Sequence, residues 1–133
     1  MMMLRATHAI ALGLLGTVCL ARMAGAQLPL PAAKPPDGAT LFKQQCATCH
    51  TSNETDPVRQ GPSLFNLVGR RAGTVDGFKY SAGFAKADFV WDEARMDAWI
   101  TNPQEMIPGS VMAYRQARPE VRAAIIAYLQ ELK

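Results

Sequence analysis

Apolar residues recur at helical spacing in three stretches of the chain, which begin near positions 38, 93 and 119. In the first stretch, "GATLFKQQCATCH", Leu41 and Phe42 lie on one side of a helix that Asp37 can cap. In the second stretch, Asp92 precedes the body "EARMDAWIT", and Pro103 follows it as a stop signal. These two patterns predict two helices.

The third stretch has the clearest amphipathic pattern. Pro119 stands at the first helical position, and Val121, Ile125 and Leu129 share one face of "EVRAAIIAYLQELK". Residues 51–74, in contrast, are interrupted by several prolines and glycines, so we expect loop there with one short turn at "SLFNLV". No alternating strand pattern or internal repeat is visible. The sequence therefore predicts a small all-α domain with long loops.

The N-terminal residues have a different character from the rest. Residues 1–26 contain Arg5, the apolar run "AIALGLLGTVCLA" and a final "AGA", which is the layout of a signal peptide cleaved after Ala26. An uncleaved N-terminal anchor is the alternative. Residues 27–37, "QLPLPAAKPPD", are predicted to be an extended proline-rich leader, and 38–133 the folded domain. This interpretation predicts an exported, periplasmic protein.

Cleavage would change the net charge of the chain and the number of its cysteine and histidine residues. Loss of Arg5 and Arg22 reduces Lys plus Arg from 14 to 12, against 11 Asp plus Glu, so the net charge becomes about +1. The remaining basic residues are scattered and form no stripe, which argues against nucleic-acid binding. The shortened chain would keep two cysteines, Cys46 and Cys49, and one histidine, His50.

These three residues form the motif "CATCH", for which four kinds of site can be considered. A disulfide across two intervening residues would close a very small loop and stabilise little. Zinc needs four ligands, but only two cysteines and one histidine remain in the shortened chain. A thioredoxin-like centre needs a strand before the motif, and no strand pattern is visible there. On a helix, by contrast, Cys46 and Cys49 could reach one porphyrin edge while His50 faces the iron. The motif thus favours covalent haem attachment over zinc binding and thiol redox chemistry.

With His50 alone, a second axial ligand would have to be a methionine. Met96 lies within the amphipathic stretch "EARMDAWI", where a methionine more often fills the core. Met112 follows Pro108 in a loop that could wrap over a flat ligand, so we favour Met112 over Met106. The alternative for either residue is a packed methionine.

Residues 38–133 resemble class I cytochromes c of the mitochondrial and bacterial c2-type group. The resemblance rests on "GATLFKQQCATCH", "GPSLFNLVGRRAG", "GFKYS", "VW", "NPQEMIPGSVM" and "IIAYL", and it covers the whole predicted domain. It implies a cytochrome c fold around one haem c, bound through Cys46 and Cys49 and ligated by His50 and Met112. It also implies that the family's terminal helices cross, with Gly38 in close contact.

The resemblance further implies a set of residues around the haem. The Pro62 carbonyl would accept the Nδ1–H of His50 and orient its ring. Arg70, Tyr80 and Trp91 would donate hydrogen bonds toward the haem propionates, although plain core packing is the alternative for the two aromatic residues.

Two positions depart from the family pattern. Trp99 stands where a tyrosine is usual, which puts a hydrogen bond to the methionine sulfur in doubt. Phe84 replaces a small polar residue and predicts a drier pocket. The family's lysine-rich face is sparse here.

The function implied by the resemblance is shuttling of single electrons between redox proteins, not enzymatic catalysis. Membrane-bound respiratory complexes are among the expected donors and acceptors, and we expect a monomer. The alternative is a dedicated haem subunit of a periplasmic dehydrogenase or oxidase complex.

Overall fold

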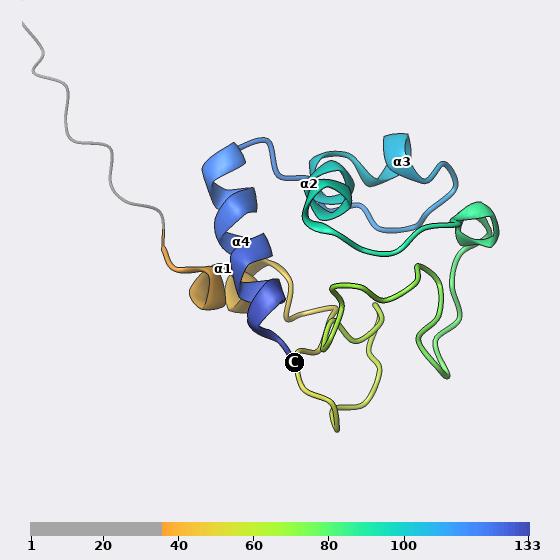
Figure 1. Ribbon diagram of the computed structural model, residues 1–133, viewed down its shortest axis with the longest axis horizontal. Helices are drawn as coiled ribbons and strands as arrows, with labels where there is room; N and C mark the ends of the chain where they lie inside the picture. The colour runs from red at the N-terminus through yellow and green to blue at the C-terminus, as the bar shows by residue number, and fades with distance from the viewer. Residues whose placement is uncertain (1–35) are drawn as a thin grey trace, which may run out of the picture. The chain divides into compact units, whose positions relative to one another are not determined.

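The computed structural model describes residues 36–133, in which short helices are joined by long loops (Figure 1). The helices are α1 (Gly38–Gln45), the 3-10 helix η1 (Ala82–Lys86), α2 (Glu93–Thr101), α3 (Pro103–Met106) and α4 (Pro119–Glu131). Within these residues the only strand-like pairing is an isolated bridge between Arg71 and Val90. The fold is therefore all-α, as predicted. The predicted signal peptide and most of the predicted leader lie outside the described residues.

Helix α1 begins at the predicted position, but it ends before the "CATCH" motif, which was predicted to lie on the same helix. The Asp37 side chain accepts a hydrogen bond from the Thr40 backbone N–H at 3.0 Å and so caps the helix. The α-helix ends at Gln45, and Cys46 to Cys49 form a hydrogen-bonded turn. The prediction that both cysteines lie on an α-helix is therefore wrong. Proximity of the two thiols comes from a turn instead.

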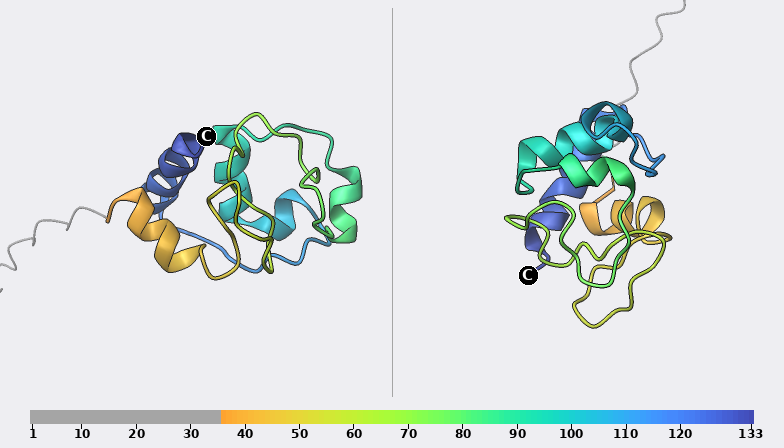
Figure 2. Two further views of the ribbon diagram at one scale, coloured as in Figure 1. Left: turned by 90° about the horizontal axis from the view of Figure 1, so that it is seen from below. Right: turned by 90° about the vertical axis from the view of Figure 1, so that its right-hand side faces the viewer.

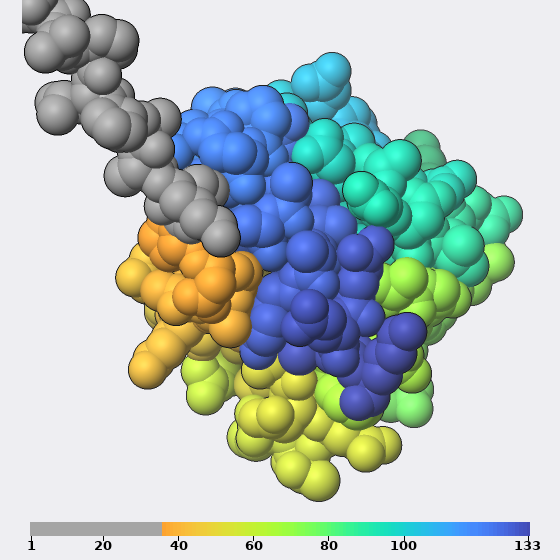
Figure 3. All heavy atoms as spheres, turned by 60° about the vertical axis from the view of Figure 1, so that its left-hand side comes forward, coloured from red at the N-terminus to blue at the C-terminus, as the bar shows by residue number. Residues whose placement is uncertain are grey.

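Helices α1 and α4 cross in close contact, and their adjacent surfaces are visible in Figure 3. A Cβ on Gly38 would lie 2.1 Å from the Ala124 carbonyl oxygen and 2.8 Å from the Tyr128 Cβ. The rings of Phe42 and Tyr128 pack with their centroids 5.2 Å apart. Only glycine at position 38 allows the two backbones to approach this closely, so the expected crossing is present.

Helix α2 also starts as predicted, because the Asp92 carboxylate accepts the Arg95 backbone N–H at 2.8 Å. Pro103 ends this helix, but it also begins the short α3, which the sequence pattern did not predict. Proline suits the first position of a helix as well as it stops a preceding one, because its missing N–H is not needed there. The 3-10 helix η1 was likewise not predicted.

The core joins the helices to the loops. Its buried residues are Leu41, Phe42, Leu67, Ala72, Trp91, Met96, Ile100, Val121, Ile125, Ile126 and Leu129. Figure 2 shows α1 and α4 together at one end, while the loops between residues 50 and 81 curve around the rest of the domain. In the part of the chain that the structure describes, no helix has the length and apolar character needed to cross a bilayer. The loops and helices leave a cavity between them.

Candidate functional site

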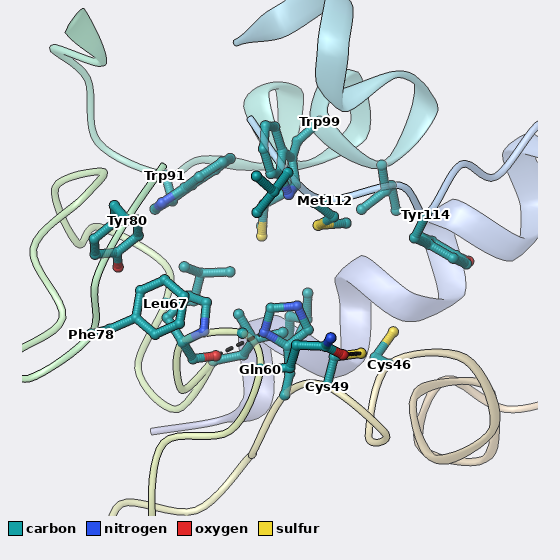
Figure 4. A pocket seen from close by; sticks show the side chains of 18 of the residues that line it. Cys46, Cys49, Gln60, Leu67, Phe78, Tyr80, Trp91, Trp99, Met112 and Tyr114 are labelled. Atoms are coloured by element: carbon teal, nitrogen blue, oxygen red, sulfur yellow. Dashed lines mark hydrogen bonds between the residues drawn. The ribbon is translucent and has the colours of Figure 1, made fainter. Parts of the chain in front are cut away.

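The cavity has a volume of about 470 Å³, which is typical of a site for a small organic group. Cys46, Cys49 and His50 line it on one side. Met112 lies across the cavity from the two cysteines, as Figure 4 shows. The cavity therefore brings together the four residues that the sequence analysis singled out for attachment and ligation.

The turn after α1 presents the motif to the cavity. The backbone N–H groups of Cys49 and His50 both donate to the Cys46 carbonyl oxygen, at 3.1 and 2.9 Å. This arrangement keeps both thiols and the imidazole on one side of the turn. The Cys49 thiol also lies 3.2 Å from Oε1 of Gln60 in the following loop, a contact that the sequence did not indicate.

The surroundings of Cys46 favour the neutral thiol in the protein alone. Burial, reinforced by the neighbouring Cys49, raises the pKa of the Cys46 thiol to about 11. Zinc binding and thiol redox reactions both require the deprotonated sulfur. Moreover, residues 36–133 contain no cluster of three or more His, Cys, Asp or Glu side chains that could hold a metal ion by themselves. The described residues therefore do not supply a complete zinc site around the two thiols.

His50 is held in a single orientation by its neighbours. Its Nδ1 lies 2.8 Å from the Pro62 carbonyl oxygen, so an N–H on Nδ1 can donate to that oxygen and leave Nε2 free as a ligand. A Cβ on Gly61 would lie 2.3 Å from Cε1 of the ring, so the imidazole occupies space that any other residue would fill. Burial lowers the pKa of His50, which favours the neutral, ligating form.

The three candidate methionines have different environments. Met112 is half-buried, belongs to a segment without helix or strand, and lines the cavity. Met96 also lines the cavity, but it is only 2 % exposed and is fixed within α2 as part of the core. Met106 ends α3 and packs against the core without lining the cavity. The geometry therefore favours Met112 as the ligand.

Arg70, Tyr80 and Trp91 all line the cavity, and Figure 4 shows the two aromatic residues on the same side of it. The Arg70 guanidinium donates to the carbonyl oxygens of Phe65 and Ser63, at 2.8 and 2.7 Å. No carboxylate of the described residues forms an ion pair with it. Burial lowers the pKa of Arg70 and raises that of Tyr80. A half-buried cation without a counter-ion favours an anionic group in the cavity.

Ser81 is a cavity residue that the sequence analysis missed. Its Oγ is buried and has no hydrogen-bond partner among the described residues. Buried hydroxyl groups normally have a partner, so this atom fits a polar group bound in the cavity. Because Ser81 directly follows Tyr80 in "GFKYS", the sequence could have indicated that it lies beside the cavity.

The two departures from the family pattern both face the cavity. Phe84 and Trp99 line it, and their ring centroids lie 5.5 Å apart. Trp99 also contacts Trp91, at 5.7 Å between centroids. These aromatic contacts make this side of the cavity apolar, in agreement with the drier pocket expected from the sequence.

The residues present fit a haem group. The walls are mainly apolar and aromatic, two cysteines and a histidine lie on one side, and a thioether lies on the other. Arg70 and the unpaired hydroxyl of Ser81 could interact with the acidic substituents of such a group. Gly61 leaves the space in which the histidine ring lies.

Comparisons with known proteins agree with this description. A family model described as Cytochrome c matches residues 36–133. Cytochrome c of Theileria annulata is 40% identical over 103 residues, which are 77% of this chain and 89% of that protein. Cytochrome c of Nigella damascena is 37% identical over 102 residues, covering 76% of this chain and 92% of that protein. Cytochrome c of Ulva intestinalis is 36% identical with the same coverage.

The relatives also correct one prediction. All three organisms are eukaryotes, whose cells have no periplasm. The periplasmic location inferred from residues 1–26 is therefore wrong. An apolar N-terminal run with small residues behind it shows at most that a segment can be processed, and it does not identify the compartment.

Proposed function

The chain belongs to the cytochrome c family, and we propose that it shuttles single electrons between redox proteins, with His50 and Met112 as the axial ligands of its haem. Family membership makes it a monohaem electron-transfer protein rather than an enzyme. Its cofactor is haem c, and Cys46 and Cys49 are in place to bind it covalently.

One observation carries the ligand assignment, namely the position of Met112 across the cavity from the Cys46–His50 turn. Haem bound there supplies an iron atom that accepts and releases one electron. His50 and Met112 would both ligate this iron, which would leave no open coordination site for a substrate. A thioether ligand favours the reduced state, while the Pro62 carbonyl increases electron donation by His50.

The remaining cavity residues have supporting roles in this proposal. Arg70, Tyr80 and Trp91 would hold the propionates, and Ser81 would add a hydroxyl that otherwise lacks a partner among the described residues. The apolar wall that includes Phe84 excludes water from the haem. A low local dielectric around the haem limits the reorganisation that accompanies electron transfer.

A visible spectrum of the purified holoprotein tests the assignment. Sharp α and β bands are expected on reduction, and a weak sulfur-to-iron charge-transfer band near the red edge is expected on oxidation. Acid-acetone extraction should leave the pigment on the polypeptide, because two thioether bonds hold it. Free haem in the extract would contradict attachment, and absence of the charge-transfer band would contradict ligation by Met112.

For the partners, we propose weak docking that depends little on charge. Residues 36–133 lack Arg5, Arg22 and Lys34, so 11 of the 14 Lys and Arg remain against 11 Asp and Glu, a net charge of zero. Four of these arginines also pair with carboxylates within the domain: Arg71, Arg95, Arg118 and Arg122. Next to Met112, Val111 is 82 % exposed at the edge of the cavity. A domain without net charge and an exposed valine at the cavity edge suit a small and transient interface.

A freely diffusing monomer is the form that best matches this surface. Gel filtration at micromolar concentration should therefore give a mass near that of one chain. A dedicated subunit of a larger redox enzyme is the second candidate. Stable co-purification with such an enzyme through several salt washes would favour it.

We also propose that residues 38–133 form the haem-binding domain, that 27–37 are an extended leader, and that 1–26 are removed from the mature protein. The proposal rests on the apolar run followed by "AGA". N-terminal sequencing should start at Gln27. Recovery of the intact chain would show that the segment is retained.

A further inference from the structure

Three polar side chains bind one another beside the cavity, which two of them, Gln45 and Tyr114, line. The Tyr114 hydroxyl donates to Oε1 of Gln45 at 2.5 Å. The Gln116 amide donates to the same oxygen at 3.1 Å and lies 3.3 Å from the Tyr114 hydroxyl. Each group therefore has a partner within the triad of Gln45, Tyr114 and Gln116. Sixty-nine residues separate Gln45 from Tyr114, so this is a tertiary contact.

The triad joins the two sides of the cavity that would supply the attachment site and the sixth ligand. Gln45 is the last residue of α1 and directly precedes Cys46. Tyr114 follows Met112 by two residues, and Figure 4 shows it at the end of the cavity nearest Cys46.

The segment that carries Met112 has little other support from its backbone. Residues 111–118 form no helix or strand until α4 begins at Pro119. Within the described part of the chain, Gln116 supplies the one backbone N–H of residues 111–117 that donates to a backbone carbonyl, that of Ile100, at 2.7 Å. The Met112 carbonyl oxygen accepts a hydrogen bond from the Gln104 side-chain amide, but at 3.5 Å this bond is long and weak. Side-chain hydrogen bonds, together with the packing of Met112 and Tyr114 against the core, therefore hold this segment.

We propose that Gln45, Tyr114 and Gln116 form a latch that limits how often Met112 leaves the iron. The inference rests on the proposed ligation by Met112. With the latch closed, residues 112–116 stay connected to the end of α1, and the thioether is held over the cavity. When the latch opens, Arg122 still holds the carbonyls of Gln116 and Ala117, and Gln104 still contacts the Met112 carbonyl. Residues 112–115 are then free to move between these points, so Met112 can swing away and another ligand can enter.

The test measures the rate at which imidazole binds to the oxidised holoprotein, because this rate depends on transient departure of Met112. Tyr114→Phe keeps the ring but removes the hydroxyl, and Gln45→Leu keeps the side-chain volume but removes the acceptor. Each should raise the rate roughly three- to tenfold, as expected for one hydrogen bond. The double variant should be no faster than Gln45→Leu alone, because the Gln45 oxygen is the acceptor through which both Tyr114 and Gln116 are joined to the end of α1.

The matched control is Tyr128→Phe, which removes a phenolic hydroxyl at the α1–α4 contact, away from residues 111–118. Its imidazole rate should equal that of the wild type. Unchanged rates in Tyr114→Phe and Gln45→Leu, or effects that add in the double variant, would overturn the latch. Failure of the underlying ligation is recognised separately, because the wild-type protein itself would then lack the charge-transfer band.

Discussion

The imidazole of His50 occupies the space in which a side chain on Gly61 would lie. A Cβ on Gly61 would be 2.3 Å from Cε1, 2.6 Å from Nδ1 and 2.8 Å from Nε2 of that ring. The next residue, Pro62, supplies the carbonyl that lies 2.8 Å from Nδ1. The glycine-proline pair thus provides both the space and the hydrogen-bond acceptor that orient the histidine.

Gly61→Ala should therefore displace the His50 ring. We expect a loss of about 1–3 kcal/mol in the free energy of unfolding, as for other overpacked sites. A weaker histidine bond should also increase the high-spin signal in the visible spectrum of the oxidised holoprotein. Guanidinium unfolding and that spectrum measure the two effects.

Gly69→Ala is the control for this change. Gly69 has φ +81°, and a Cβ there would meet no atom within 4 Å. Its cost should be backbone strain of about 1 kcal/mol, with an unchanged haem spectrum. If both variants show the same spectrum as the wild type, Gly61 does not control the position of His50.

Met112→Ala should open the sixth coordination site. Carbon monoxide should then bind the reduced protein, and the reduction potential should fall by on the order of 100 mV, a fraction of the roughly 0.8 V range that axial ligands set. Met106→Ala should have little effect on either property, because Met106 packs at the end of α3 and does not line the cavity. Loss of the charge-transfer band in Met106→Ala, but not in Met112→Ala, would show that Met106 and not Met112 is the ligand.

Gly38→Ala should disturb the crossing of α1 and α4. The new methyl group would meet the Ala124 carbonyl and the Tyr128 Cβ, so the helices must separate. We expect a loss of about 1–3 kcal/mol in the free energy of unfolding, measured in guanidinium. Lys43→Ala, at an exposed position of the same helix, should change it by less than about 0.5 kcal/mol.

The Asp37 cap of α1 predicts that the free energy of unfolding depends on pH. Hydrogen bonds from the Thr40 backbone and hydroxyl hold the pKa of Asp37 below its ordinary value of 3.8. Because the pKa is lower in the folded state, the carboxylate stabilises the fold above about pH 4, and the effect is lost as the pH falls through the folded pKa. Asp37→Ala should therefore lower the free energy of unfolding at pH 7, and the loss should become smaller as the pH falls below 4.

Unfolding curves of wild type and Asp37→Ala between pH 2 and 7 check this prediction. Glu131→Ala removes an exposed carboxylate from the last turn of α4, where the helix dipole disfavours negative charge. It should not lower stability at pH 7. A difference between wild type and Asp37→Ala that stays constant down to pH 2 would exclude the ionised cap as its cause.

Association with redox partners should depend only weakly on salt, since the described domain has no net charge. Charge reversal at the exposed Lys79 or Arg115 should change association by less than about 1 kcal/mol. Val111→Glu, at the apolar edge of the cavity, should slow electron transfer more than either reversal. Stopped-flow rates at low and physiological salt test both expectations. A steep salt dependence would contradict docking that depends little on charge.

Local signals in the sequence correctly predicted much of the fold. Asp37, Asp92 and Pro119 mark helix starts that the structure contains, because a cap or a proline acts on the first turn of its own helix. The same holds for the "CATCH" spacing, since neighbouring residues in a turn share a side whatever the path of the later chain. The sequence failed where one residue has two local meanings, as Pro103 does in ending α2 and starting α3.

Contacts between distant residues were decided only by the tertiary structure. The sequence could not show that the Tyr114 hydroxyl meets Gln45, or that Ser81 leaves a buried hydroxyl beside the cavity. It favoured Met112 over Met106 on loop character, but only the packing of α3 places Met106 outside the cavity lining. The sequence by itself therefore determined the helix starts and the attachment motif, because these depend on neighbours along the chain. The cavity and the hydrogen bonds beside it depend on side chains up to 71 residues apart, which only the folded chain brings together.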